Sequence, residues 1–221
     1  MIAKQLINPS VVPLSPADTG SEYLYHMDEN KLYFIPVVEQ NKYIGLLSED
    51  EIFNLVDPDE PVRGQKITLK NPSVKDYQHV FEVIRVMAEL KISVLPVVSE
   101  KNIYLGSITP DSLLGWLGDY AAVALPGGII VLELNQNDYV ISQIAQIVES
   151  QDAKILSLYV AFEKDSTKME VTLKVNKTEI QPLIQTFNRY NYIIKATYSE
   201  DLQMLDDLRD RYNALMNYLN I

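Results

Sequence analysis

The sequence predicts an α+β protein in which one structural unit occurs twice and a different sheet-and-helix module follows. Residues 35–38 read IPVV and are followed by GLLS at 45–48, while residues 95–98 read LPVV and are followed by GSIT at 106–109. A repeat with a period of about 60 residues indicates a unit that buries its apolar face only against a neighbour. After the second copy the pattern changes, and apolar strands alternate with amphipathic stretches in βαββαβ order.

The first copy, residues 1–62, is expected to fold in β-α-β-β-α order. Its first helix should open at Ser15-Pro16, because a capping residue followed by proline is a typical helix start. Two strands joined by a tight turn follow at 32–38 and 42–47, where the apolar runs are rich in β-branched residues. The hydroxyl residue that ends the second strand should cap a further helix over 48–56.

The second copy, residues 63–120, is expected to repeat this plan. Apolar side chains recur at helical spacing over 76–90. Paired strands are expected at 93–98 and 103–108, and Thr109 should open the last helix of the copy. The two copies therefore predict an internal two-fold relation.

The third module, residues 121–198, is expected to be a ferredoxin-like domain. Either Asn137 or Asp138 should cap its first helix. The predicted strands are 129–134, 154–162, 169–175 and 192–198, and the predicted helices are 138–151 and 178–190.

Residues 199–221 predict one last helix. Its apolar stripe consists of Leu202, Leu205, Leu208, Tyr212, Leu215 and Leu219, and charged residues occupy the opposite face. At about three heptads the stripe is at the lower limit for a coiled coil. Docking on its own domain is favoured over the sealing of a dimer, and both interpretations stay open.

Composition excludes several classes of function. The chain has 221 residues, 47% of them hydrophobic, and a net charge of −11 from 19 basic and 30 acidic residues. The acidic balance argues against binding to nucleic acid or to anionic membranes, because both need a basic face. No cysteine is present, which excludes disulfides and thiolate chemistry. Without a signal-like or membrane-spanning run, the cytoplasm is the expected compartment.

The duplicated Pro-Val-Val, Gly and Ser/Thr pattern resembles a tandem pair of cystathionine-β-synthase-type (CBS) domains over residues 1–119. Residues 127–198 resemble an ACT domain in their order of elements, and the combination resembles regulatory proteins of the acetoin-utilisation type. The resemblance implies a small-molecule sensor without catalysis of its own. It also implies that AMP, ATP or S-adenosylmethionine is the regulatory ligand, bound in a cleft between the copies, with no obligatory cofactor and no metal.

The resemblance implies that the Ser/Thr at each helix start and the residue three positions later face the cleft. These are Ser48 and Glu51 in the first copy, and Thr109 and Ser112 in the second. A carboxylate at the later position accepts hydrogen bonds from ribose hydroxyls. Asp111 is one position early, turned by about 100° on a helix, and should point elsewhere. The strand residues expected beside the ligand are Ile35, Pro36, Leu95 and Pro96.

A structural interpretation of the same residues competes with ligand binding. Ser48-x-x-Glu51 is also a capping box, and Thr109-Pro110 is also a capped helix start. For a phosphate, the candidate cations are Lys31, Lys91, Arg63 and Arg85, although a solvated lysine at a helix end is the favoured interpretation of Lys31 and Lys91. The loop 134–139 lacks the glycine that ligand-binding ACT domains often have there, which favours a pairing or packing role over an amino-acid site.

The sequence therefore leads to two main hypotheses. The first is a non-catalytic regulatory protein that binds an adenine-containing ligand in the cleft of Ser48 and Glu51. Its ACT-like module would then form a homodimer or contact an unknown client protein. The second is an oligomeric scaffold whose clefts are vestigial, which Ser112 and the glycine-free loop favour. An enzyme is disfavoured, because no nucleophile–base pair or metal-ligand cluster stands out in the sequence.

Overall fold

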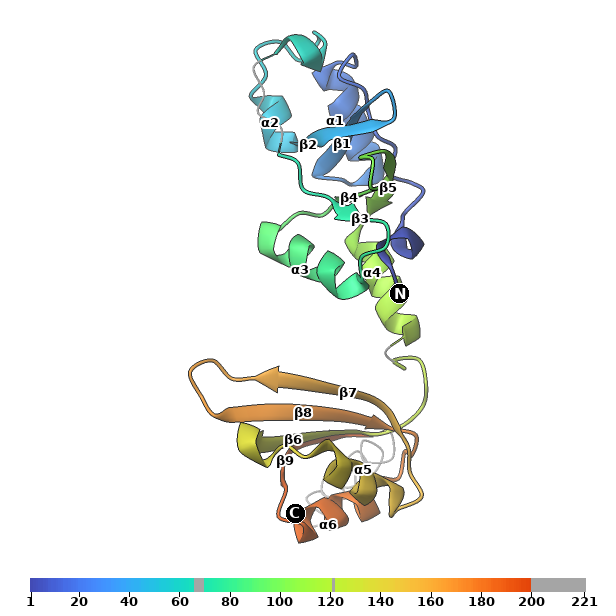
Figure 1. Ribbon diagram of the computed structural model, residues 1–221, viewed down its shortest axis with the longest axis vertical. Coiled ribbons are helices and arrows are strands. Elements are labelled where there is room, and N and C mark those ends of the chain that lie inside the picture. The colour runs from blue at the N-terminus through green and yellow to red at the C-terminus, as the bar shows by residue number, and fades with distance from the viewer. Residues whose placement is uncertain (66–69, 121, 200–221) are drawn as a thin grey trace, which may run out of the picture. The chain divides into compact units, whose positions relative to one another are not determined.

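The computed structural model describes residues 1–65, 70–120 and 122–199 (Figure 1). The chain divides into two compact units, Met1–Leu117 and Gly118–Ile221. The first unit holds both copies of the repeat, and the second holds the βαββαβ module. The helix expected over 199–221 lies almost wholly outside the described residues.

The first copy contains helix α1 (Gly20–Asn30), strands β1 (Phe34–Glu39) and β2 (Lys42–Ser48), and helix α2 (Glu49–Phe53). The helix expected to open at Ser15 begins instead at Gly20. Thr19 and Glu22 form a capping box there, which gives side-chain partners to two backbone N–H groups at the helix start. The core of the first copy consists of Leu14, Tyr23, Met27, Ile35, Val37, Leu47, Ile52 and Val62.

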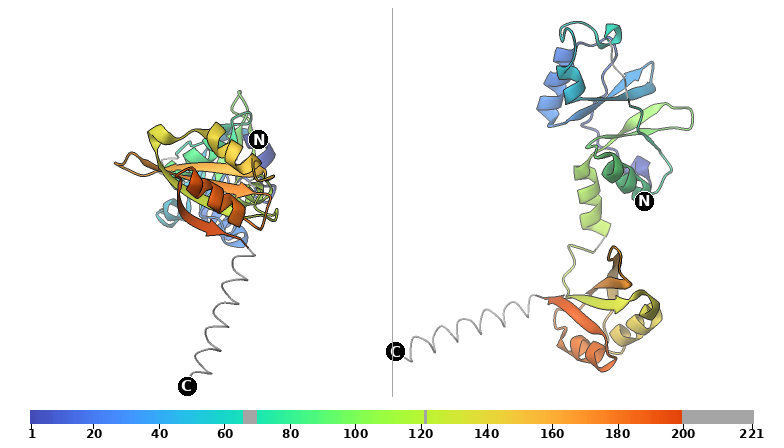
Figure 2. Two further views of the ribbon diagram at one scale, coloured as in Figure 1. Left: turned by 90° about the horizontal axis from the view of Figure 1, so that it is seen from below. Right: turned by 90° about the vertical axis from the view of Figure 1, so that its left-hand side faces the viewer.

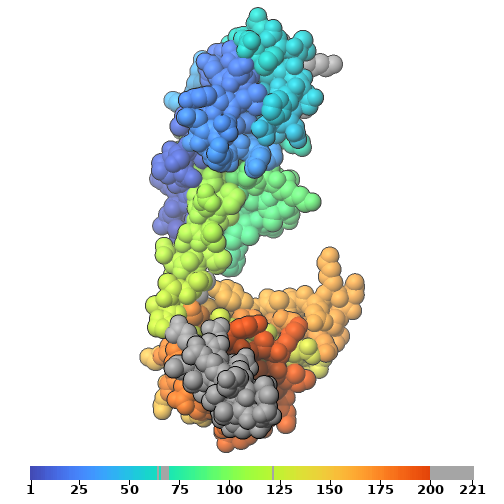
Figure 3. Space-filling view, turned by 180° about the vertical axis from the view of Figure 1, so that it is seen from behind, coloured from blue at the N-terminus to red at the C-terminus, as the bar shows by residue number. Residues whose placement is uncertain are grey.

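The second copy follows the same order with α3 (Val80–Leu90), β4 (Leu95–Val98), β5 (Tyr104–Ile108) and α4 (Pro110–Tyr120), preceded by the short strand β3 (Val74–Lys75). Corresponding details recur in both copies. The two hairpins have a register shift after Val37 and after Val97. Lys31 and Lys91 end equivalent helices with the same left-handed φ of 53°. The predicted internal two-fold relation is confirmed down to backbone conformation. Helix α4 has no buried residue and lies on the surface in Figure 3.

The segment that opens each copy packs on the other copy. We call this segment the lead-in: residues 1–11 in the first copy and residues 70–72 in the second. At the N-terminus, a 3-10 turn (Ala3–Leu6) contributes its apolar residues to the core of the second copy. Asn8 N donates to Ser107 O at 2.8 Å. In the reverse direction, Leu46 N donates to Lys70 O at 2.8 Å, which holds the lead-in of the second copy against β2. This exchange places residues of both copies around two equivalent clefts.

The second unit is a four-stranded antiparallel sheet in the order β7-β8-β6-β9. Its elements are β6 (Ile129–Asn135), α5 (Ile141–Glu149), β7 (Ile155–Phe162), β8 (Lys168–Val175), α6 (Gln181–Arg189) and β9 (Ile193–Tyr198). This order along the chain and across the sheet confirms the ferredoxin-like prediction. The expected cap at Asn137 or Asp138 was wrong, because α5 begins after Val140, whose side chain makes no capping bond.

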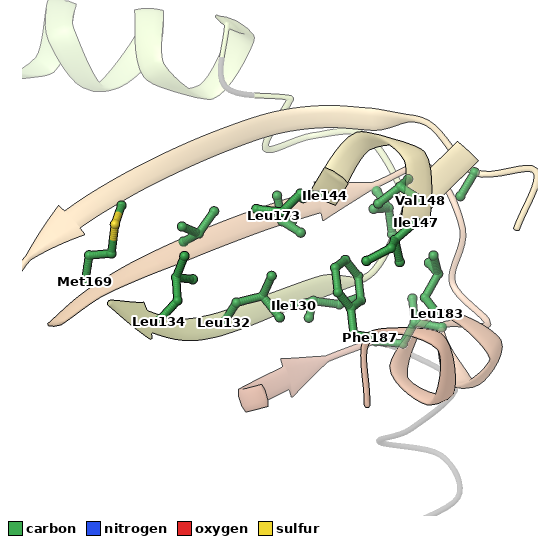
Figure 4. Packing of buried hydrophobic residues seen from close by; sticks show 14 residues of the cluster. Ile130, Leu132, Leu134, Ile144, Ile147, Val148, Met169, Leu173, Leu183 and Phe187 are labelled. Atoms are coloured by element: carbon green, nitrogen blue, oxygen red, sulfur yellow. The ribbon is translucent and has the colours of Figure 1, made fainter. Parts of the chain in front are cut away.

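Helices α5 and α6 cover one face of this sheet, as Figure 2 shows. Alternate residues of β6 and β8 point toward them and are almost fully buried. In Figure 4, Ile130 and Leu132 of β6 lie opposite Phe187 of α6, whose ring is fully buried. The core of the unit therefore lies between the sheet and its two helices. Among the described residues, no helix is both long and apolar enough to cross a membrane.

Candidate functional site

The first cleft lies between the two copies and has a volume of about 310 Å³. One side comes from the end of β2 and the start of α2, and the other from the lead-in of the second copy and the end of α3. Its wall is mainly apolar, with a polar end at Ser48 and Glu51. The lining residues are Phe34, Leu46, Ser48, Glu51, Lys70, Asn71, Pro72, Leu90 and Ile92.

Ser48 and Glu51 form a capping box at the start of α2. The Glu51 N–H donates to Ser48 Oγ at 3.3 Å, and Glu51 Oε2 accepts from both the backbone N–H and the hydroxyl of Ser48, each at 2.8 Å. These bonds use only one carboxylate oxygen. Because Glu51 also lines the cleft, its capping role and an acceptor role toward the cleft are geometrically compatible.

The opposite wall of the first cleft is tied to β2 by a buried tyrosine. Tyr43 is 5% exposed, and its hydroxyl donates to Pro72 O at 2.9 Å. Burial raises the pKa of this hydroxyl well above its usual value, so it stays a donor at neutral pH. Next to Pro72, Lys70 brings a cation to the cleft that the sequence interpretation did not single out. In the sequence, this wall is marked by Asn71-Pro72, which repeats the Asn8-Pro9 of the first copy.

The second cleft is the equivalent site at the start of α4, with a volume of about 210 Å³. Thr109 lines it and is 4% exposed, and its Oγ1 accepts from Asn8 Nδ2 at 3.1 Å. Ser112 is not among the lining residues, and its hydroxyl lies 3.2 Å from that of Thr109. The expectation that Asp111 points away was wrong, because Asp111 lines this cleft together with Lys31.

The four strand residues predicted to face the ligand lie in the protein core. Ile35 and Leu95 are at most 1% exposed, and Pro36 and Pro96 are also buried. None of the four is among the residues that line either cleft. Side chains alternate between the two faces of a strand, which is why Phe34 reaches the first cleft while Ile35 packs inward.

The remaining predicted cations lie away from the first cleft. Arg85 pairs with Glu82 and Glu89 on the exposed side of α3, and Arg63 pairs with Glu39. Lys91 lines neither cleft, whereas Lys31 lines the second and lies 3.1 Å from Asp28. Of the four candidates, Lys31 alone lies in a cleft.

The loop after β6 borders a separate cavity of about 280 Å³ in the second unit. Its polar groups largely bond to each other. Asn135 Nδ2 donates to Asp138 Oδ2 at 3.0 Å, and the Tyr192 hydroxyl donates to Gln143 Oε1 at 3.0 Å. These internal bonds agree with the packing role that the sequence interpretation favoured for the loop.

Three solved structures illustrate what the chain is similar to. A CBS domain pair/ACT domain protein from Thermotoga maritima is 19% identical, with a TM-score of 0.49, over 54% of this chain and 98% of that one. A putative acetoin utilization protein from Vibrio cholerae is 18% identical, with a TM-score of 0.47, over 54% and 91%. The protein CBSX2, in complex with AMP, is 17% identical, with a TM-score of 0.47, over 53% and 96%.

The family model of the CBS domain matches this chain twice, at residues 3–58 and 65–119. These matches together cover half of the chain and coincide with the two copies described above. The second unit has the sheet order and helix placement of an ACT-like domain. The chain therefore belongs to the CBS-domain family, with a tandem CBS pair followed by an ACT-like domain.

Proposed function

We propose that this chain is a non-catalytic regulatory protein that binds an adenine-containing small molecule in the first cleft. The observation that carries the proposal is the composition of that cleft. An apolar wall that includes Phe34 and Leu46 suits a flat base, while Ser48 and Glu51 offer acceptors for sugar hydroxyls at one end. Its volume is at the lower end of the range for small-molecule sites, about 300–1,000 Å³.

The role of Glu51 follows from which of its oxygens is already bonded. Oε2 accepts both capping bonds from Ser48. Within the described part of the chain, Oε1 accepts no hydrogen bond, and it is therefore the atom that we assign to the ribose. Lys70 lines the same cleft and supplies a positive charge for a phosphate group on the ligand.

The ACT-like domain, in this proposal, provides the contact with a second copy of the chain or with a client protein. Several of its apolar side chains are exposed, among them Tyr159, Ile193 and Tyr198, at 48–62%. A ligand that binds one arrangement of the protein better than another would shift the population toward that arrangement.

Isothermal titration calorimetry with AMP, ATP and S-adenosylmethionine tests the proposal directly. We expect saturable binding of at least one of the three, accompanied by a rise in Tm, because a ligand that binds only the folded protein stabilises it. The absence of both heat and thermal shift with all three compounds would refute the adenine assignment.

A second candidate function is an interaction scaffold with vestigial clefts. The second cleft supports it, because Ser112, which stands where the first copy has Glu51, bonds to Thr109 instead of lining the cleft. This function predicts an oligomer that needs no ligand and dissociates when residues 199–221 are deleted. A monomer by light scattering, at all protein concentrations, would contradict it.

A further inference from the structure

The face of the ACT-like sheet that turns away from α5 and α6 carries an apolar strip. On β6, Ile130, Leu132 and Leu134 enter the core, so Ile129 and Val131 point to the opposite face. Directly paired residues share a face, and the partners of these two on β9 are Tyr198 and Ala196. The strip also includes Ile193, the partner of Glu133 on β9. We call these five residues the β6–β9 strip: Ile129, Val131, Ile193, Ala196 and Tyr198.

The β6–β9 strip is exposed at its outer edge and bordered by lysines. Ile193 is 62% exposed and Tyr198 is 55% exposed. On the same face, Lys168 of β8 pairs with Glu133 of β6, and Lys195 of β9 reaches across β6 to pair with Glu170 of β8. A third lysine, Lys174 on β8, donates to the backbone carbonyls of Ala122 and Val123. Glu133, Glu170 and Glu163 offset these three lysines, so the face is close to neutral, in a chain with a net charge of −11.

The segment best placed to cover this strip is the chain's own C-terminus. Strand β9 ends at Tyr198, within the strip, and residues 200–221 follow with only the buried Ser199 between. The spacing of Leu202, Leu205 and Leu208 predicts an amphipathic helix, which over 200–221 would be on the order of 30 Å long. That length is enough to follow the whole of β6, whose 7 residues span about 24 Å.

We propose that residues 200–221 pack on the β6–β9 strip of their own chain and form the missing layer of the ACT-like domain. Direct attachment gives the segment a high effective concentration at the strip, which a second copy lacks. The segment is also acidic, with five carboxylates at Glu200, Asp201, Asp206, Asp207 and Asp210 against arginines at 209 and 211. Because the face of the strip is close to neutral, the acidic segment meets no net charge repulsion there. The proposal does not depend on ligand binding in the CBS clefts.

Cysteine cross-linking in the full chain tests the placement, because the natural chain has no cysteine. The test variant carries Val131→Cys and Leu208→Cys and is treated with a short bis-maleimide. We expect an internally linked monomer whose yield does not change with protein concentration. The matched control carries Gln146→Cys and Leu208→Cys, since Gln146 is exposed on α5, on the other side of the sheet. Linkage only between chains, or equal linkage in the control, would overturn the proposal.

A second measurement reports on the strip itself. In the full chain, replacing Leu205 and Leu208 by Asp should release the segment and raise the fluorescence of an apolar-surface dye several-fold. Replacing Asn213, which is not part of the leucine stripe, by Asp should leave dye binding unchanged. Unaltered dye binding in the double variant would count against the proposal. AMP titration of the same variants separates this outcome from the proposed ligand function, because the residues that line the first cleft all belong to the CBS pair.

Discussion

Glu51→Gln separates the two roles of the carboxylate in the first cleft. Glutamine is an accepted residue at this position of a capping box, since its amide oxygen can take the bonds that Oε2 accepts from Ser48. The amide nitrogen would then face the cleft in place of Oε1. An N–H group cannot accept a hydrogen bond from a ribose hydroxyl, so the variant should keep the fold and lose the ligand contact.

The two effects differ in expected size. Because the cap is preserved, the free energy of unfolding should change by less than about 0.5 kcal/mol. A hydrogen bond to a charged group contributes about 1.5–3 kcal/mol, and 1.4 kcal/mol is a tenfold change in affinity. The Kd for the adenine ligand should therefore rise roughly 10- to 100-fold. Ser48→Ala should instead lower the stability by about 1 kcal/mol, because the cap itself is lost.

The chain contains a matched control for this experiment. Thr19 and Glu22 form the same capping box at the start of α1, with Glu22 Oε2 accepting from Thr19 N at 2.8 Å. Neither residue lines either cleft. Glu22→Gln should match Glu51→Gln in thermal denaturation and leave calorimetric titration unchanged. If Glu51→Gln binds the ligand as tightly as the natural chain, or if Glu22→Gln weakens binding equally, the assignment of Oε1 to the ligand is wrong.

Three further predictions concern the framework around the site. Burial raises the pKa of the Tyr43 hydroxyl, so on raising the pH the unfolded chain loses the hydroxyl proton before the folded chain does. The free energy of unfolding should therefore fall above about pH 10, by up to about 1.4 kcal/mol per pH unit. Tyr43→Phe should reduce that slope in denaturant titrations, while an unchanged slope would contradict the reasoning. Gly106→Ala should lower the free energy of unfolding by about 3 kcal/mol, because φ is 145° and the new Cβ would lie 2.3 Å from Ile7 Cγ2. The control is Gly115→Ala in α4, where no atom lies within 4 Å of the new Cβ, and it should leave the stability unchanged or raise it. Thermal denaturation measures both effects. Phe187→Ala should cost about 3–5 kcal/mol in the ACT-like unit, measured by hydrogen exchange, and leave exchange in the CBS pair unchanged.

Local sequence signals predicted the fold well because the strands and the repeat are local patterns. The Pro-Val-Val strands, the paired turns and the βαββαβ order all appear in the structure as expected. The errors lie at helix starts. Ser15 bonds within its own turn, where its backbone N–H donates to Asp18 Oδ2. The helix begins only after Thr19, which forms a capping box with Glu22. Capping residues compete over several positions, and the sequence alone does not rank them.

The candidate site was only partly predictable, for a physical reason. Ser48 and Glu51 are three residues apart, so their relation is visible in the sequence. Lys70 reaches the same cleft only because the lead-in of the second copy crosses to the first copy. Asp111 lines the second cleft although its position on the helix predicts otherwise, because helix geometry alone does not give the direction of the cleft. Contacts that form because a segment of one copy packs on the other copy leave no pattern in the spacing of neighbouring residues.

Because each lead-in segment crosses to the other copy, a ligand in the first cleft would contact residues of both copies. Ser48 and Glu51 belong to the first copy, whereas Asn71 and Pro72 belong to the lead-in of the second. The Tyr43 hydroxyl already links these two parts through Pro72 O. A molecule that contacts both walls adds to that link, and its binding energy stabilises the arrangement of the pair by mass action. An effect on a partner further requires that the ligand bind two arrangements with different affinity, because equal affinity shifts no population. The cleft is built from both copies, so any change in their arrangement alters the distance between its walls, and this is the geometric condition for such a difference.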